Sequence, residues 1–215
     1  MKPQRLMTAL LVAGGLLTTA GCATTSGGSV PADAQFVEPL TVGESLPPIT
    51  LLDQAGQAFD LNAAVAQRPS ILVFYRGGWC PYCRSHLAQL NNIELQLDSM
   101  GYQVFAISAD KPSKLMETAE LEAPTFTLLS DSGMDAARAL GIAFRVDDET
   151  FRRYNEDYGI DLEASSGHTH HQLPVPSVFI VGPDGVIRYE YVNPDYKVRL
   201  APDDLIAAAF AARGD

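Results

Sequence analysis

The sequence predicts an α/β fold in which helices flank a central mixed β-sheet. Three observations lead to this prediction. Short runs of β-forming residues alternate with longer segments of helical periodicity. The last two strand-like segments are joined by a tight turn, which adds an antiparallel hairpin. The chain then ends in an amphipathic segment, so parallel units come first and a C-terminal hairpin and helix come last.

The predicted elements follow one another in order after residue 70. The apolar run 71–75 is bounded by Pro69 and Gly77 and is too short for a helix, which indicates a buried strand. Apolar residues then recur at helical spacing from Pro81 until Gly101 ends the helix. The later predictions are strand 102–108, helix 112–121, strand 126–129, helix 131–140, strand 178–181, strand 186–192 and helix 203–212. The remaining long stretch, 147–173, is interpreted as an irregular insertion, and it carries Tyr154, Tyr158 and three histidines.

The first residues have the pattern of an export signal. Lys2 and Arg5 precede an apolar run, 6–17, that is too short to span a bilayer comfortably. The ending Ala20-Gly21-Cys22 resembles a bacterial lipoprotein signal, which implies lipidation of Cys22, although Thr19 departs from the usual leucine. We therefore expect a signal over 1–21, a flexible tether over 22–35 and one domain over 36–215. The expected location is the cell envelope, on an extracytoplasmic membrane face.

The charge balance excludes one class of partner. The chain has 26 acidic and 15 basic residues and a formal net charge of −11. Because nucleic-acid binding needs a basic surface that neutralises phosphates, no nucleic-acid partner is expected. The sequence also predicts no cofactor.

Two of the three cysteines form a Cys-x-x-Cys motif at a strand-to-helix junction. Cys80 lies at the predicted helix N-terminus and Cys83 one turn inside it. Free backbone N–H groups and the helix dipole stabilise a thiolate at that position. The second sulfur is close enough to close a disulfide on the first. The motif predicts redox chemistry by this pair, with Arg76 and Arg84 as flanking positive charges.

A longer segment carries a family resemblance. The residues Phe74-Tyr75-Arg76-Gly77-Gly78-Trp79-Cys80-Pro81-Tyr82-Cys83-Arg84 resemble the peroxiredoxin-like branch of the alkyl hydroperoxide reductase and thiol-specific antioxidant family. The resemblance extends through 173–181 and 184–188 and covers the chain from about residue 40 to its end.

The resemblance implies a thioredoxin-like fold and a mechanism. Cys80 is then the nucleophile that a hydroperoxide oxidises to sulfenic acid, and Cys83 resolves it into a disulfide that a thioredoxin-like dithiol reduces. Trp79 supports the site as part of the motif. Pro176 matches the proline that is cis in thioredoxin-fold proteins and faces the cysteines, and its bend is expected to bring the backbone of Val175 toward an extended substrate.

Two positions depart from the pattern of typical peroxiredoxins. Gly77 stands where those proteins have Thr or Ser, and Pro176 falls where they have an arginine facing the cysteine. Both missing groups normally polarise the peroxide O–O bond, and losing one such donor typically costs about 100-fold in rate. A membrane-tethered thiol–disulfide oxidoreductase that acts on protein disulfides therefore stays open as an alternative.

A third hypothesis is a copper-binding protein. It uses Cys80 and Cys83 together with His168, His170 or His171, because thiolates and imidazoles suit copper. A solvated histidine-rich loop is the competing interpretation of that cluster. His86, in the helix after the motif, is expected to be a surface or packing residue.

Overall fold

The computed structural model describes residues 30–213 of the 215-residue chain. The predicted signal and Cys22 lie outside these residues. Within them, no helix is long and apolar enough to cross a membrane.

A seven-stranded mixed sheet forms the centre of the fold, in the order β2-β1-β5-β4-β3-β8-β9. The central strand β3 pairs in parallel with β4 and antiparallel with β8, and β9 completes the C-terminal hairpin. The predicted mixed sheet and hairpin are confirmed. The strands are β1 (Thr50–Leu52), β2 (Ala58–Asp60), β3 (Ser70–Tyr75), β4 (Gln103–Ser108), β5 (Thr127–Ser130), β8 (Ser177–Val181) and β9 (Ile187–Val192).

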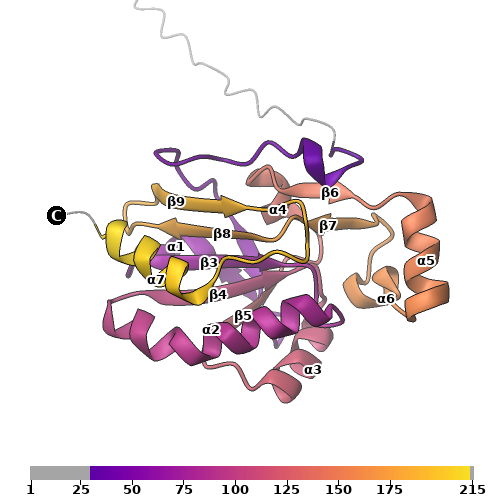
Figure 1. The fold of residues 1–215 in the computed structure, drawn as a ribbon, viewed down its shortest axis with the longest axis horizontal. Coiled ribbons are helices and arrows are strands. Elements are labelled where there is room, and N and C mark those ends of the chain that lie inside the picture. The colour runs from indigo at the N-terminus through magenta and orange to yellow at the C-terminus, as the bar shows by residue number, and fades with distance from the viewer. Residues whose placement is uncertain (1–29, 214–215) are drawn as a thin grey trace, which may run out of the picture.

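Helices cover both faces of this sheet. Residues Ile71, Val73 and Tyr75 of β3 pack on the face covered by α2, α3 and α7, while Leu72 and Phe74 pack on the opposite face with α1 and α4. This alternation is the period of two that a strand buried on both sides requires. Figure 1 shows α2, α3 and α7 on the near face. The helices are α1 (Leu61–Val65), α2 (Pro81–Ser99), α3 (Pro112–Glu122), α4 (Asp135–Ala139) and α7 (Pro202–Ala211).

The stretch expected to be irregular contains two helices. They are α5 (Asp148–Tyr158) and α6 (Leu162–Ser166), which lie beyond one end of the sheet (Figure 1). Next to them, β6 (Ala143–Arg145) pairs antiparallel with β7 (Gln172–Pro174). The expectation of a structureless segment was wrong because side-chain caps begin both helices: the carboxylate of Asp147 accepts from the backbone N–H of Thr150, and that of Asp161 accepts from that of Ala164.

The N-terminal part of the domain begins earlier than expected. The carbonyl oxygen of Pro31 accepts a hydrogen bond of 2.8 Å from the backbone N–H of Arg145, and a short 3₁₀ helix, η1 (Ala34–Phe36), follows. Val30 packs against the core. Ordered contacts therefore reach into the segment that we expected to be tether.

Candidate active site

The cysteine pair lies where β3 passes into α2. Cys80 is the N-cap residue of α2, and Pro81 occupies the first helical turn, where its missing N–H costs nothing. The backbone N–H of Cys80 donates to the carbonyl of Gly77 at 3.1 Å. Both cysteines are free thiols, and their residues are only 1% and 0% exposed. The predicted strand-to-helix placement is confirmed, but the pair is buried rather than open to solvent.

Two glycines allow the loop before Cys80 to pack tightly. A Cβ on Gly77 would lie 2.3 Å from Nε1 of Trp79, and one on Gly78 would lie 2.0 Å from Oγ1 of Thr118. The Gly78 N–H donates to Oδ2 of Asp110 at 2.7 Å. The Trp79 indole therefore occupies the space that a side chain at position 77, where typical peroxiredoxins carry Thr, would need.

The pKa values of the two thiols are shifted in opposite directions. The hydrogen bond from the Cys83 thiol, helped by the positive charges of Arg76 and Arg199, lowers the pKa of Cys80 to about 6, although burial acts against it. Burial raises the pKa of Cys83 well above its usual value, and the neighbouring Cys80 raises it further. At neutral pH, these shifts favour a thiolate at Cys80 and a neutral hydrogen-bond donor at Cys83.

Arg76 is a buried component of the site. Its residue is 3% exposed, and Nη2 donates to the hydroxyl of Tyr154. The guanidinium lies 4.9 Å from the Trp79 ring centroid and 4.3 Å from that of Tyr196. Aromatic faces and one hydroxyl hold this charge beside Cys80, so Arg76 is not a solvated surface arginine.

Arg84 plays no such part. Its Nε lies 2.5 Å from Oε1 of Glu122 on α3, and its side chain is half exposed. The expectation that its charge acts on the cysteines is wrong, because the side chain next to Cys83 on α2 turns toward Glu122, and Arg76 and Arg199 are the arginines that act on the thiols. His86, in contrast, is buried, and burial lowers its pKa to about 4, as expected for a packing residue.

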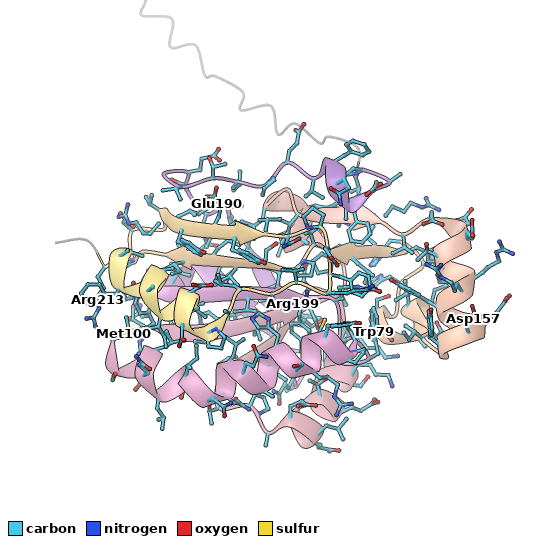
Figure 2. The ribbon with its side chains drawn as sticks, in the orientation of Figure 1. Trp79, Met100, Asp157, Glu190, Arg199 and Arg213 are labelled. Carbon is cyan, nitrogen blue, oxygen red and sulfur yellow. The ribbon has the colours of Figure 1, made fainter. Side chains whose placement is uncertain are left out.

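Three residues of the site were not found from the sequence. Nη2 of Arg199, in the segment before α7, lies 3.4 Å from Sγ of Cys83. Asp110, at the end of β4, is a buried carboxyl whose pKa burial raises to about 7. Tyr154 comes from α5, and the sequence predicts no catalytic part for it. Figure 2 shows that α5 lies near the end of α2 that carries Trp79, whereas Met100 lies at the opposite end.

The expected role of Val175 and Pro176 is not supported. No cis peptide bond occurs between residues 30 and 213, so the bond before Pro176 is trans. The N–H of Val175 donates to the carbonyl of Ile142 at 2.8 Å, and its carbonyl accepts from Oγ of Ser177. Because the small β6–β7 sheet runs directly into β8, the Val175 backbone groups are already paired and do not bind an extended substrate.

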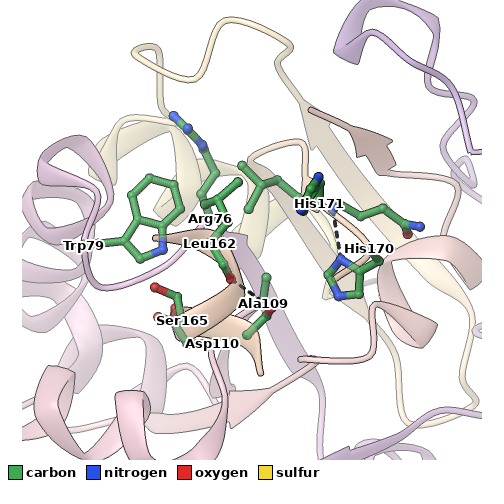
Figure 3. Close-up of a pocket in the computed structure, with 11 residues that line it drawn as sticks. Arg76, Trp79, Ala109, Asp110, Leu162, Ser165, His170 and His171 are labelled. Carbon is green, nitrogen blue, oxygen red and sulfur yellow. Dashed lines mark hydrogen bonds between the residues drawn. The ribbon is translucent and has the colours of Figure 1, made fainter. Parts of the chain in front are cut away.

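The histidine cluster is structural. Nδ1 of His170 accepts from the backbone N–H of Gln172 and its Nε2 contacts the carbonyl of Ser132 at 2.8 Å, while His171 stacks on Phe151 at 3.8 Å. His168 stacks on His170. His170 and His171 line a narrow recess whose other side is formed by Trp79 and Arg76 (Figure 3).

These contacts bear directly on the copper hypothesis. Between residues 30 and 213, no three His, Cys, Asp or Glu side chains lie close enough together to hold a metal ion. The described residues therefore give no support to a copper site built from Cys80, Cys83 and the histidines. Hydrogen bonds to the backbone and ring stacking explain the cluster instead.

A wider cleft of about 320 Å³ opens on the other side of Arg76. Its walls come from the N-terminal segment, α5 and the segment after β9. Arg76, Tyr154, Tyr158, Pro176 and Tyr196 are among the residues that line it. The cleft thus leads from solvent to the Arg76–Tyr154 hydrogen bond beside Cys80.

Comparisons of the sequence with family models and with known proteins point to the same family. The model of the AhpC/TSA family matches residues 42–190. Peroxiredoxin Bcp of Escherichia coli (strain K12) is 34% identical over 106 residues, which cover 49% of this chain and 67% of that protein.

Solved structures show the same fold. Peroxidoxin BcpB from Mycobacterium tuberculosis aligns with a TM-score of 0.62 at 18% identity, covering 81% of this chain and 99% of that one. Reduced Prx3 from Vibrio vulnificus, solved in complex with H2O2, aligns with a TM-score of 0.65 at 16% identity, covering 79% and 99%. The predicted thioredoxin-like fold is confirmed.

Proposed function

Because the chain belongs to the AhpC/TSA family, we propose that it is a thiol peroxidase in which Cys80 attacks a hydroperoxide and Cys83 resolves the product. The observation that carries this proposal is the buried Cys80 thiolate, with its pKa lowered to about 6 beside Arg76. Because the Cys80 thiolate is buried, a small hydroperoxide can reach it more readily than the disulfide of a folded protein can. The relatives named peroxiredoxins support the same reaction class.

The proposed reaction has three steps. The Cys80 thiolate bonds to the terminal oxygen of ROOH, the O–O bond breaks, and RO⁻ leaves and takes a proton from solvent. The sulfur is oxidised to sulfenic acid and the peroxide is reduced to an alcohol, or to water when R is hydrogen. The Cys83 thiol then displaces water from the sulfenic acid as the disulfide forms. A thioredoxin-like dithiol reduces that disulfide and becomes oxidised itself.

Single-turnover experiments test the assignment of roles. Reduced protein is mixed with one equivalent of hydroperoxide, and thiol loss is followed by mass spectrometry with dimedone as a sulfenic-acid trap. We expect Cys80→Ser to lose the reaction, and Cys83→Ser to accumulate a dimedone adduct on Cys80. Consumption of peroxide by Cys80→Ser at the wild-type rate contradicts the proposal. Rapid reduction of insulin with no peroxide reaction favours the disulfide oxidoreductase instead.

We also propose that the chain is exported and anchored to a membrane through lipid on Cys22. The support is the charged, apolar and small-residue pattern of residues 1–22. Radioactive palmitate supplied to expressing bacterial cells is expected to label the wild-type chain but not Cys22→Ser. Equal labelling of both chains contradicts the lipid anchor.

A further inference from the structure

The peroxide reaction needs a hydrogen-bond donor for the departing oxygen, and position 77 does not supply one. Donors aimed at developing negative charge are among the largest contributions to catalysis. Gly77 has no side chain, and the Trp79 indole occupies the space into which a Thr at that position would extend. The donor must therefore come from another part of the chain.

Tyr154 is placed to provide it. Its hydroxyl accepts a hydrogen bond from Nη2 of Arg76. Among residues 30–213, no acceptor takes the proton of this hydroxyl, so the O–H remains available to a substrate. Burial raises the pKa of Tyr154, and the charge of Cys80 adds to the effect. The hydroxyl is thus protonated at neutral pH and close enough to Cys80 to respond to its charge.

Neighbouring aromatic rings fix the orientation of this side chain. The Tyr154 ring lies 6.0 Å from the Trp79 ring centroid and 6.4 Å from that of Tyr158. The Arg76 guanidinium lies 5.3 Å from the Tyr154 ring centroid as well as bonding its hydroxyl. A donor held in place before substrate arrives costs little reorganisation during the reaction.

We propose that Tyr154, supplied by the inserted helix α5, is a catalytic residue that donates its O–H to the peroxide oxygen leaving as RO⁻. Arg76 holds the Tyr154 hydroxyl by hydrogen bonding and adds positive charge at the same point. This inference rests on the peroxidase function proposed above. The Tyr154 proton stabilises the alkoxide through a hydrogen bond, while the proton that completes the alcohol comes from solvent.

The cleft beside Arg76 and Tyr154 gives this assignment a consequence for substrate class. Its volume of about 320 Å³ exceeds the needs of H2O2, and Tyr154, Tyr158 and Tyr196 give it aromatic walls. A hydroperoxide with an organic group can lie in the cleft and direct its O–O bond toward Tyr154. Because the Tyr154 hydroxyl is proposed to act on the O–O bond and not on the organic group, its loss is expected to slow the reactions with H2O2 and with organic hydroperoxides alike.

The test compares Tyr154→Phe with Tyr189→Phe. Both variants lose one hydroxyl and keep the ring, but Tyr189 lies on β9 and does not line the cleft. Each is assayed for its second-order rate with H2O2 and with cumene hydroperoxide. Each is also assayed for alkylation of Cys80 by iodoacetamide across pH 4–9, which reports the thiolate alone.

We expect Tyr154→Phe to react with both peroxides about 100-fold more slowly, the typical cost of one lost donor, with an unchanged alkylation profile. Tyr189→Phe is expected to behave as wild type. Wild-type peroxide rates in Tyr154→Phe overturn the assignment, and so does a parallel loss of alkylation, since Tyr154 then acts on the thiolate rather than on the peroxide. A wild-type protein that does not react with peroxide overturns the proposed function itself. This outcome is distinguishable from a failure of the Tyr154 assignment alone, in which the wild-type protein still reacts.

Discussion

At the scale of single residues, the chemistry of this site depends on the asymmetry between two neighbouring sulfurs. The largest influence lowering the pKa of Cys80 is the hydrogen bond from the Cys83 thiol, ahead of the charge of Arg76. Cys83 is held neutral by burial. In the proposed reaction, Cys83 therefore activates Cys80 before it forms the disulfide with it.

Cys83→Ala is expected to raise the pKa of Cys80 above its value of about 6, because the strongest donor to the thiolate is lost. Since only the thiolate reacts, alkylation by iodoacetamide falls as pH drops through the pKa, and its midpoint moves to higher pH in this variant. Cys83→Ser is the matched control because it keeps an O–H donor, and its midpoint is expected to stay closer to that of wild type. The same midpoint in Cys83→Ala and wild type contradicts this account.

Arg199 acts on the second sulfur. Its Nη2 lies 3.4 Å from Cys83 Sγ, and its charge lowers the pKa that burial has raised. Arg199→Gln is expected to slow disulfide closure by about threefold for each unit that the pKa of Cys83 rises, since the loss of thiolate is partly offset by its higher nucleophilicity. Sulfenic acid formation is expected to change less, because Arg199 is the smallest of the influences on the pKa of Cys80.

Stopped-flow Trp79 fluorescence and dimedone trapping separate these two steps. The control is Arg188→Gln, since Arg188 pairs with Asp184 in the remote β8–β9 hairpin. Closure at the wild-type rate in Arg199→Gln contradicts the role given to Arg199.

The residues that sequence reasoning found and missed differ in how far apart they lie along the chain. Cys80 and Cys83 are recognisable because three residues of spacing determine their geometry. Arg199 lies 116 positions from Cys83, and Tyr154 lies 78 positions from Arg76. No local pattern carries such pairs, so only the packed fold reveals them.

At the scale of elements, the insertion held signals that the sequence analysis did not use. Helix α5 contains no fully buried residue, yet its aromatic residues Phe151, Tyr154 and Tyr158 recur at helical spacing. Its ends are further signals: Asp147 caps the N-terminus, and Gly159 closes the C-terminus with φ of 64°. Such caps were available in the sequence as predictors of this helix.

A helix without buried residues depends strongly on its caps. Asp147→Ala removes the carboxylate that accepts from the N–H of Thr150 at 2.8 Å and is expected to cost about 1 kcal/mol. Amide hydrogens of α5 are then expected to exchange about fivefold faster, and the peroxide rate to fall because Tyr154 is held less firmly. Hydrogen exchange followed by mass spectrometry checks this locally.

The matched control for α5 is Asp161→Ala, which removes the corresponding cap of α6. Its faster exchange is expected in α6 rather than in α5. Unchanged exchange of α5 in Asp147→Ala contradicts the dependence on the cap.

At the scale of the whole molecule, two buried carboxyl groups lie at the same edge of the sheet. Asp110 follows β4 and Asp131 follows β5, and burial raises their pKa values to about 7 and about 6. The unfolded chain releases these protons near pH 4, whereas the folded chain retains them. The folded state thus binds more protons between those values, so both groups make the protein less stable as pH rises from 4 toward 7.

Asp110→Asn is expected to remove the larger of these two pH dependences. The amide keeps an oxygen that can accept from the N–H of Gly78, so the loop before Cys80 retains its support. Urea unfolding is measured for both proteins at pH 5 and pH 8. The free energy of unfolding of wild type, relative to that of Asp110→Asn, is expected to fall between these values by at most about 3 kcal/mol, because about two units of the pKa shift lie above pH 5. The contribution of Asp131 is common to both proteins and cancels. The exposed Asp98→Asn is expected to track wild type, and an Asp110→Asn protein that does the same contradicts the protonated carboxyl beside the cysteines.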